Sequence, residues 1–462
     1  MIEVDDNKVI VVPVPEQARR KLAVRWLQLG VLALGLAGLF ALLLVLSRTP
    51  GSEAFFPWVD FFRTALVVHV DQSVLIWFLA MSGVVWCLTA QAGSGSIRLQ
   101  YLAFGLAMMG ALGIALSAFL GDGAPLMNNY VPVLQRPLFF LTLGLFGFGI
   151  ALQALIGLST YRGVLWSRLH LPSLAAFTVA LAVLISVVAL LTAWWQIPAE
   201  VTGQSYYEYL FWGAGHSLQF AYTQLIILAW IWLALHSGVA LPGDSRWYYW
   251  LLILGIAPVL LVPLIYLFYQ TVTIESRTAF TQLMQYGGGL AVTPIGMLIF
   301  IGLLHANRAE PNERPLRRSL WMSMLLFFSG GAIALFISGV NTIIPAHYHG
   351  SIVGVTMGLM GLAYLLLPKL GYPPVQGRLA ELQPWIYGIG QLLHITGLAM
   401  SGAMGIQRKT AGAAQGLDTL SAKLAMGVMG IGGLLAVIGG VIFVWVMLRI
   451  FITTRSSTGN SE

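Results

Sequence analysis

Twelve long apolar segments place the strongest limit on the fold of this chain of 462 residues. A helix needs roughly 20 apolar residues to cross a membrane, and segments of that kind follow one another along nearly the whole sequence. They lie at approximately 23–47, 64–90, 99–121, 135–158, 171–195, 207–236, 247–270, 283–305, 319–341, 346–368, 384–404 and 423–450. Because little sequence is left between them, we predict an all-α integral membrane protein: a bundle of twelve transmembrane helices that forms one domain over residues 1–462.

Lys and Arg are unevenly divided between the two sets of loops. If the amino terminus lies in the cytoplasm, 17 of the 24 basic residues fall on that side of the membrane. Cytoplasmic loops carry the excess of Lys and Arg in membrane proteins, so we expect a cytoplasmic amino-terminal segment over 1–22 and a cytoplasmic tail over 451–462. The net charge of +7 therefore reflects topology, and it does not indicate a nucleic-acid partner.

Chemistry in such a chain must come from a few polar side chains within the membrane. Cys87 is the one cysteine, which excludes an intramolecular disulfide and a thiolate metal cluster built from this chain alone. Histidine is the next candidate, because an imidazole in hydrocarbon is costly unless it is paired. Of the eight histidines, His170, His236 and His305 fall at cytoplasmic helix ends, where interfacial water satisfies them.

Four of the remaining histidines share one depth in the outer half of the predicted bundle. His69 in the second segment, His216 in the sixth and the pair His347 and His349 in the tenth all lie near the outer end of their helix, while His394 lies in the eleventh. Residues two apart on a helix differ in direction by about 200°. The two histidines of the pair therefore point to opposite faces, where each can hold a different planar cofactor. The alternative is a hydrogen-bonded cluster at a helix amino terminus.

These residues resemble the pattern of subunit I of the haem-copper oxidase superfamily, which includes terminal oxidases and bacterial nitric oxide reductases. The helix count, the second-helix His, the "GH" of the sixth helix and the "HYH" of the tenth match in order across nearly the whole chain. The resemblance implies a bacterial-type inner membrane and two b-type haems, since no CxxCH motif for covalent attachment occurs. It implies that His347 ligates a high-spin haem and that His69 and His349 ligate a low-spin haem. It also implies that Arg408 and Lys409 face the haem propionates.

The seventh segment departs from the family pattern. Family members carry two adjacent histidines there that complete a non-haem metal site, whereas this chain reads "LIYLFYQTVTIESRTAF". His216 matches the sixth-helix ligand of that metal, and a single imidazole binds a divalent ion poorly. Replacement ligands for iron or copper would have to come from Gln219, one turn away, or from Glu275, with Tyr269 and Gln270 nearby.

Two further departures bear on the reaction. Common oxidases carry a Tyr four residues after the sixth-helix His, and this chain has Phe220 there, which favours nitric oxide over oxygen as the substrate. Asp71 is the one acid well inside a predicted helix. No charged route for proton uptake from the cytoplasm is therefore visible, and we expect no proton pumping. Asp71 either transfers protons from the outer face or pairs with an outer arginine such as Arg63.

The sequence thus predicts a respiratory haem protein in which electrons from an outer donor pass through the low-spin haem to the high-spin haem, where a diatomic is reduced. His347 and His216 are the catalytic candidates, and whether the chain is an oxidoreductase enzyme stays open. The expected partners are membrane lipid and an outer donor: a donor subunit, a soluble cytochrome c or a cupredoxin. One alternative is a two-haem electron-transfer or gas-binding subunit that has lost the non-haem metal site. Another is a haem-free transporter on the same fold.

Overall fold

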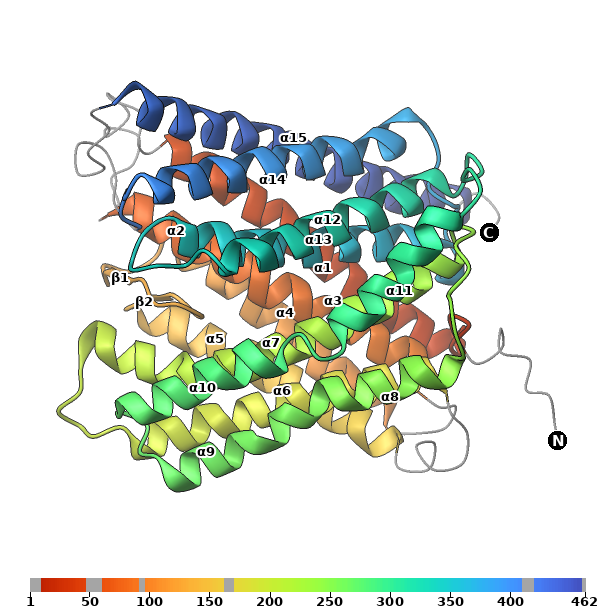
Figure 1. The fold of residues 1–462 in the computed structure, drawn as a ribbon. Helices are drawn as coiled ribbons and strands as arrows, with labels where there is room; N and C mark the ends of the chain where they lie inside the picture. Colours follow the sequence, from red (N-terminus) through yellow and green to blue (C-terminus); the bar gives the residue numbers. More distant parts are fainter. Residues whose placement is uncertain (1–9, 47–59, 91–95, 162–169, 409–418, 459–462) are drawn as a thin grey trace. The chain divides into compact units, whose positions relative to one another are not determined.

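Long helices make up nearly the whole of the computed structural model, which describes residues 10–46, 60–90, 96–161, 170–408 and 419–458 (Figure 1). In chain order the elements are α1 (Gln17–Leu46), α2 (Phe61–Val70), the π-helix η3 (Asp71–Ile76), α3 (Trp77–Thr89), α4 (Ile97–Leu116), β1 (Pro125–Leu126), β2 (Val133–Leu134), α5 (Pro137–Thr160), α6 (Leu171–Gln196), α7 (Gly203–Leu235), α8 (Ser245–Ile256), the 3-10 helix η4 (Ala257–Leu261), α9 (Val262–Phe268), α10 (Ile274–Gly287), α11 (Val292–His305), α12 (Arg314–Ala334), α13 (Ile343–Lys369), α14 (Arg378–Ala403) and α15 (Leu420–Thr458). The two short strands pair as an antiparallel hairpin.

Within these residues the helices form twelve runs, because α2 continues through η3 into α3, α8 through η4 into α9, and α10 into α11. Ten of the runs are long and apolar enough to cross a membrane, and the other two, α12 and α14, each begin at an arginine. The predicted twelve-helix membrane bundle is confirmed. Several boundaries differ by a few residues from the prediction, and the largest difference is in the eighth run. This run begins at Ile274 and is interrupted at residues 288–291, where a run of glycines disfavours the helix.

Two compact units make up the chain, and each is described by itself. The first unit holds residues up to 228 together with 242–301, and the second holds 229–241 together with the residues from 302 onward. The description of the chain as one transmembrane domain stays a prediction.

A buried arginine organises the end of α4 in the first unit. Arg136 directly precedes α5 and is 1% exposed. Its guanidinium donates hydrogen bonds to the carbonyl oxygens of Ser117 and Ala118, and its Nε donates to the Gly123 carbonyl at 3.0 Å. Carbonyl groups at the end of a helix lack helical partners. One cation therefore satisfies the carboxyl end of α4 and holds the hairpin in front of α5.

Replacing Arg136 by Met is expected to lower the free energy of unfolding by about 2–4 kcal/mol, because buried carbonyls lose their donor. Thermal unfolding in detergent, followed by circular dichroism, measures this loss. Arg98→Met is the matched control, because Arg98 is exposed in the first turn of α4, and its unfolding midpoint should match that of the unmodified protein. Equal midpoints for the two variants would show that Arg136 does not anchor this region.

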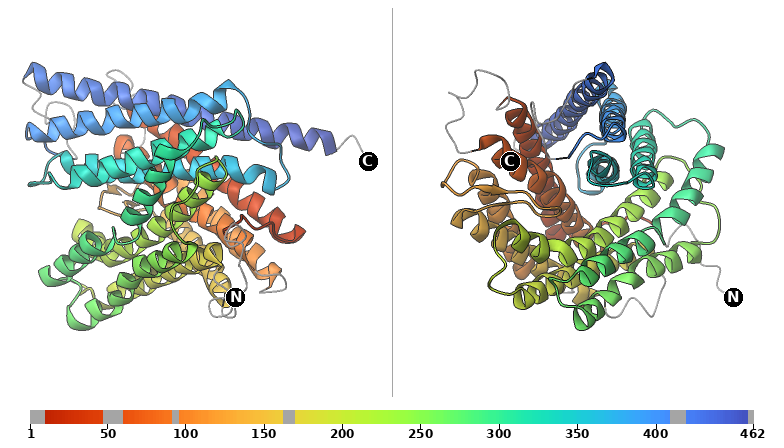
Figure 2. Two further views of the ribbon diagram at one scale, coloured as in Figure 1. Left: turned by 45° about the vertical axis from the view of Figure 1, so that its right-hand side comes forward. Right: turned by 60° about the vertical axis from the view of Figure 1, so that its left-hand side comes forward.

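Helices of the second unit pack closely at glycines. α14 and α15 lie side by side (Figure 1), and a Cβ on Gly390 would lie 2.4 Å from Ala436 N. Small residues of this kind let membrane helices approach closely. α15 has 39 residues, and its carboxyl-terminal end extends past α14 (Figure 2). At 1.5 Å per residue its length is about 58 Å, more than the roughly 30 Å that a bilayer core requires.

Candidate functional site

The histidine pair of the tenth segment lies near the start of α13. This end of the helix is fixed by α14 and the chain that follows it. The Thr342 hydroxyl donates to the Leu398 carbonyl at 2.9 Å, and the Thr342 amide donates to the Ile406 carbonyl at 3.0 Å. The Asn341 side chain accepts from the Ile343 amide at 3.0 Å, which satisfies one donor of the first turn. The histidine pair therefore stands on an anchored helix end.

His347 faces α12. Its Nδ1 lies 2.8 Å from the Gly330 carbonyl oxygen, and since a carbonyl only accepts, Nδ1 carries the proton. The neutral ring then keeps its lone pair on Nε2, which is how ligating histidines are oriented. The bond forms because α12 and α13 touch at Gly330, where a Cβ would lie 2.4 Å from Ser351 N and 2.8 Å from His347 O. Nε2 of His347 is therefore the nitrogen that would hold a haem iron.

His349 faces α14, so the two rings turn to different helices, as the spacing predicts. Its Nε2 lies 3.1 Å from Gln391 Oε1, and its ring centroid lies 4.8 Å from that of His394. His394 is itself held, because its Nδ1 lies 2.9 Å from the Met429 carbonyl oxygen. To bind iron through Nε2, His349 must exchange its bond to Gln391 for the metal.

His69 in the first unit repeats the arrangement of His347. Its Nδ1 lies 2.8 Å from the Ala37 carbonyl oxygen of α1, which leaves the lone pair on Nε2. The residues that follow α2 form the π-helix η3, a distortion that is frequent at functional sites. A backbone carbonyl therefore orients His69 in the way that suits the role of an iron ligand.

Asp71, the first residue of η3, is 1% exposed. Within the described part of the chain, neither carboxyl oxygen has a hydrogen-bond partner. The interpretation that Asp71 pairs with Arg63 is wrong, because Arg63 is bound to Asp60 at 3.4 Å, one turn earlier. A carboxyl group buried without a partner is costly as an anion, so a protonated Asp71 is the form that suits this position.

His216 lies in an aromatic cage rather than among metal ligands. It is 4% exposed, and its Nδ1 donates to the Trp212 carbonyl at 2.7 Å. The Tyr130 hydroxyl lies 2.9 Å from Nδ1 and 3.0 Å from Nε2. Because Nδ1 carries the proton that it donates to Trp212, the hydroxyl can donate only to Nε2. The rings of Trp212 and Phe280 lie 4.8 Å and 6.0 Å from the imidazole. Both ring nitrogens of His216 are therefore engaged.

Tyr130 lies in the loop between β1 and β2. It was not predicted as a site residue, because this loop falls outside the predicted helices. The Asn128 side chain accepts from the amides of Tyr130 and Val131, each at 2.9 Å, and this tight turn presents the phenol. The sequence feature that indicates this turn is "NNY" at residues 128–130, because Asn side chains favour turns. Burial, and to a smaller extent the charge of Glu208, raises the pKa of Tyr130. The phenol thus stays protonated and donates to His216.

The donor set around His216 does not fit a non-haem metal. Among the described residues, no three His, Cys, Asp or Glu side chains gather in a way that could hold an ion. Glu275 is exposed in the first turn of α10, and Gln219 is partly buried on α7. One imidazole whose nitrogens already have partners provides little affinity for iron or copper. Roles for Gln219 and Glu275 as replacement ligands stay predictions.

The basic pair assigned to the haem propionates is only partly described. Arg408 is half-buried and follows Gln407, which forms an isolated β-bridge with Asn341 just before α13. The bridge ties the chain after α14 to the helix end that carries the histidine pair. Lys409 lies outside the described residues.

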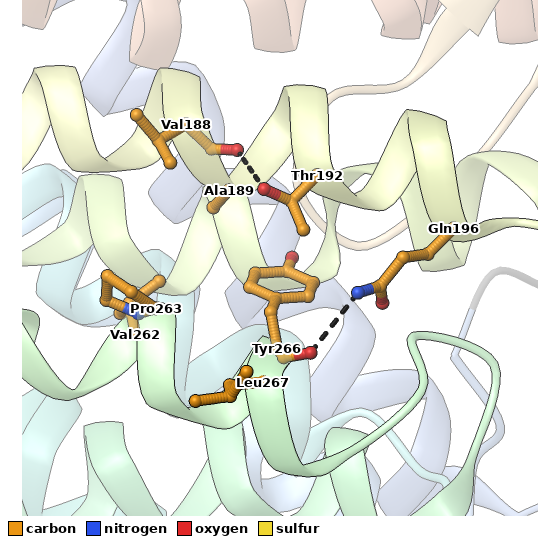
Figure 3. A pocket seen from close by; sticks show the side chains of 8 residues that line it. All are labelled: Val188, Ala189, Thr192, Gln196, Val262, Pro263, Tyr266 and Leu267. Atoms are coloured by element: carbon orange, nitrogen blue, oxygen red, sulfur yellow. Dashed lines mark hydrogen bonds between the residues drawn. The ribbon is translucent and has the colours of Figure 1, made fainter.

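A pocket of about 270 Å³ in the first unit opens between α6 and α9 (Figure 3). Two of its polar side chains are already paired: Thr192 donates to the Val188 carbonyl at 2.8 Å, and Gln196 donates to the Tyr266 carbonyl at 3.2 Å. Its walls contain no histidine or carboxylate. The ring of Tyr266 lines the pocket and also contacts Phe280 of the His216 cage at 5.2 Å. The pocket adjoins the cage but supplies no ligand of its own.

The fold defines a polytopic membrane protein in which backbone carbonyls of neighbouring helices hold partly buried histidines. The family described as "Cytochrome C and Quinol oxidase polypeptide I" matches residues 21–449. The chain belongs to this family, and hence to the haem-copper oxidase superfamily.

The chain is also similar to single proteins. The chain is 31% identical to an uncharacterized protein of Rickettsia prowazekii (strain Madrid E), over 92% of this chain and 95% of that protein. It is 29% identical to an uncharacterized protein of Aquifex aeolicus (strain VF5), over 78% of this chain and 88% of that protein. The fold is similar to that of a heme-copper terminal oxidase studied as a dimer by cryo-EM, with a TM-score of 0.58, 16% identity, and coverage of 95% of this chain and 83% of that one.

Gly330→Ala is expected to remove most of the carbon monoxide difference signal of the purified protein. The added Cβ meets the backbone of α13 and moves the carbonyl that orients His347, at a cost of about 1–3 kcal/mol. Gly331→Ala is the matched control, because a Cβ there meets nothing within 4 Å, and it should keep the signal. If both variants keep the full signal, the Gly330 carbonyl does not orient a haem ligand.

Proposed function

We propose that this protein is a respiratory membrane haem protein that passes electrons from a donor on the outer face, through a low-spin haem, to a high-spin haem at which a diatomic is reduced. The observation that carries the proposal is the pairing of His347 with the Gly330 carbonyl at 2.8 Å in a chain of the oxidase family. A bound haem would supply an iron that carries electrons and has one open coordination position. His347 binds that iron through Nε2, and Gly330 keeps the imidazole in the matching tautomer.

The low-spin haem is assigned to His69 and His349, and the surroundings of each ring support this role. The Ala37 carbonyl orients His69, and Gln391 and His394 stand beside His349. His69 and His349 would together hold this haem iron, whose chemistry would then be electron transfer. Arg408, together with Lys409, is assigned to the propionate groups, because guanidinium and ammonium groups bind carboxylates well.

Nitric oxide is the diatomic that we favour, with two nitric oxide molecules, two electrons and two protons giving nitrous oxide and water. Phe220 stands where common oxidases carry a redox-active tyrosine, so this chain lacks at that position a group that assists cleavage of the O–O bond. Among the described residues, Asp71 is the one acidic side chain in the buried set. With no chain of buried carboxylates to carry protons inward, the reaction is assigned as non-pumping, with protons drawn from the outer face.

A two-haem electron-transfer or gas-binding subunit is the second candidate function. It is favoured by His216, whose nitrogens contact Trp212 and Tyr130 in a position where a catalytic member of the family would hold a second metal. In either case the partners are membrane lipid and an outer donor, which is a subunit or a soluble cytochrome c or cupredoxin. The bacterial origin of both relatives supports an inner-membrane location.

His349→Ala is expected to abolish the low-spin haem spectrum and to leave a haem that reacts with carbon monoxide, because only the six-coordinate iron loses a ligand. Reduced and carbon monoxide difference spectra of the purified variant measure both. His236→Ala is the matched control, since that histidine bonds the carbonyl of Trp232 in its own helix and is assigned no haem. Loss of the carbon monoxide-reactive haem in His349→Ala would reverse the assignment of the pair.

Elemental analysis is expected to give two haem irons per chain. A further iron or copper that disappears in His216→Ala would support a rebuilt non-haem site and the reductase. Two haem irons without a third metal would support the electron-transfer or gas-binding candidate, because the two-metal chemistry of the family is then missing. A purified chain that shows no haem absorbance would contradict both candidates and leave the transporter alternative.

A further inference from the structure

Four arginines line one pocket at the start of α12 in the second unit. The pocket has a volume of about 240 Å³ and is formed by Arg308, Ala309, Arg314, Arg317 and Arg318. The first two residues belong to the chain after α11, and the arginines at 314, 317 and 318 belong to the first turns of α12. The wall of the pocket is mostly apolar, so it is formed by the carbon chains of these arginines. Their guanidinium groups suit an anion that accepts several hydrogen bonds at once.

Two of the four arginines hold the protein together. The Arg317 guanidinium donates to the carbonyls of Ser237 and Asn307, and so joins the end of α7 to the chain after α11. Arg318 donates to the Glu381 carbonyl and bonds its carboxylate at 3.1 Å. These contacts hold the side chains of Arg317 and Arg318 in place. The other two arginines of the pocket are therefore the ones considered as ligands for an anion.

Arg308 and Arg314 are the arginines that can turn to a ligand. Arg308 is exposed, and Arg314 is 45% exposed and lies 3.8 Å from a Glu381 oxygen that Arg318 already holds. The negative charge of Glu313 acts on Arg317. The Glu313 carboxylate also accepts a hydrogen bond from the Glu310 amide at 3.1 Å. Glu313 and Glu381 thus offset two of the four positive charges that line the pocket. The remaining charge favours an anion.

The sequence beside the pocket marks the start of a predicted membrane segment. Directly after Arg318 the sequence turns apolar with "SLWMSMLLFF", and Trp321 lies about two turns into α12, as is typical of a membrane interface. Leu304, near the end of α11, and Leu382, beside Glu381, are 62% and 47% exposed. Exposed apolar side chains on these two helices suit contact with the acyl chains of a lipid.

We propose that this pocket binds the phosphate headgroup of an anionic phospholipid of the adjoining leaflet. Arg308 and Arg314 contact the phosphate oxygens, while Arg317 and Arg318 hold the pocket in shape. The site belongs to the second unit alone and involves none of the proposed haem ligands, so it does not depend on the proposed function. Its occupancy would brace the start of α12, the helix whose Gly330 orients His347.

Native mass spectrometry of the full chain, released from detergent after incubation with phosphatidylglycerol or with phosphatidylcholine, tests the site. The double variant Arg308→Gln/Arg314→Gln should bind phosphatidylglycerol roughly tenfold to thirtyfold more weakly than the unmodified chain, since each basic residue near the surface contributes about 1 kcal/mol. Binding of phosphatidylcholine should not change. The matched control is Arg98→Gln/Arg246→Gln, which removes two exposed arginines from the first turns of α4 and α8.

Three outcomes would overturn the proposal. One is equal binding of phosphatidylglycerol by the double variant and the unmodified chain, and another is an equal loss in the control variant, which would show a general charge effect. The third is displacement of the lipid by inorganic phosphate at similar concentration, which would assign the pocket to a soluble anion. Circular dichroism confirms that each variant is folded, and the readout needs no haem, so it is independent of the tests of the proposed function.

Discussion

The cost of leaving an imidazole unpaired in hydrocarbon determines how this protein holds its histidines. His69, His347 and His394 each direct Nδ1 at a backbone carbonyl of a neighbouring helix. A carbonyl only accepts, so each contact selects the tautomer with the proton on Nδ1 and turns the lone pair of Nε2 outward. The hydrogen bond that pairs one nitrogen of a partly buried imidazole also leaves the other nitrogen with the lone pair that a metal would need.

Close helix packing makes these contacts possible. Gly330 brings the backbone of α12 against that of α13, and Gly432 brings α15 against α14 close to His394. A Cβ at either position would meet the backbone of the facing helix. These two glycines therefore allow the short helix distances on which the histidine contacts depend.

The ring nitrogens of His216 also need hydrogen-bond partners, but these come from other groups than the carbonyls of neighbouring helices. The ring is satisfied by the Trp212 carbonyl of its own helix and by the Tyr130 hydroxyl from a loop, and aromatic rings enclose it. Where metal-binding relatives would gather histidines, this chain gathers hydrogen-bond and aromatic partners. The family fold is thus retained with a different immediate environment at this helix, which is why the reductase and the electron-transfer candidates both stay in view.

The sequence by itself determined the membrane bundle, because a run of about 20 apolar residues has no other stable place. It also placed His347 and His349 on opposite sides of one helix, since helical rotation per residue is constant. It did not reveal that Arg63 prefers Asp60 to Asp71, or that Tyr130 meets His216. These contacts join residues through loop turns and side-chain directions that no local period encodes. Only the tertiary structure decided which carbonyl, hydroxyl or guanidinium reaches each buried polar group, because that depends on how closely the helices pack.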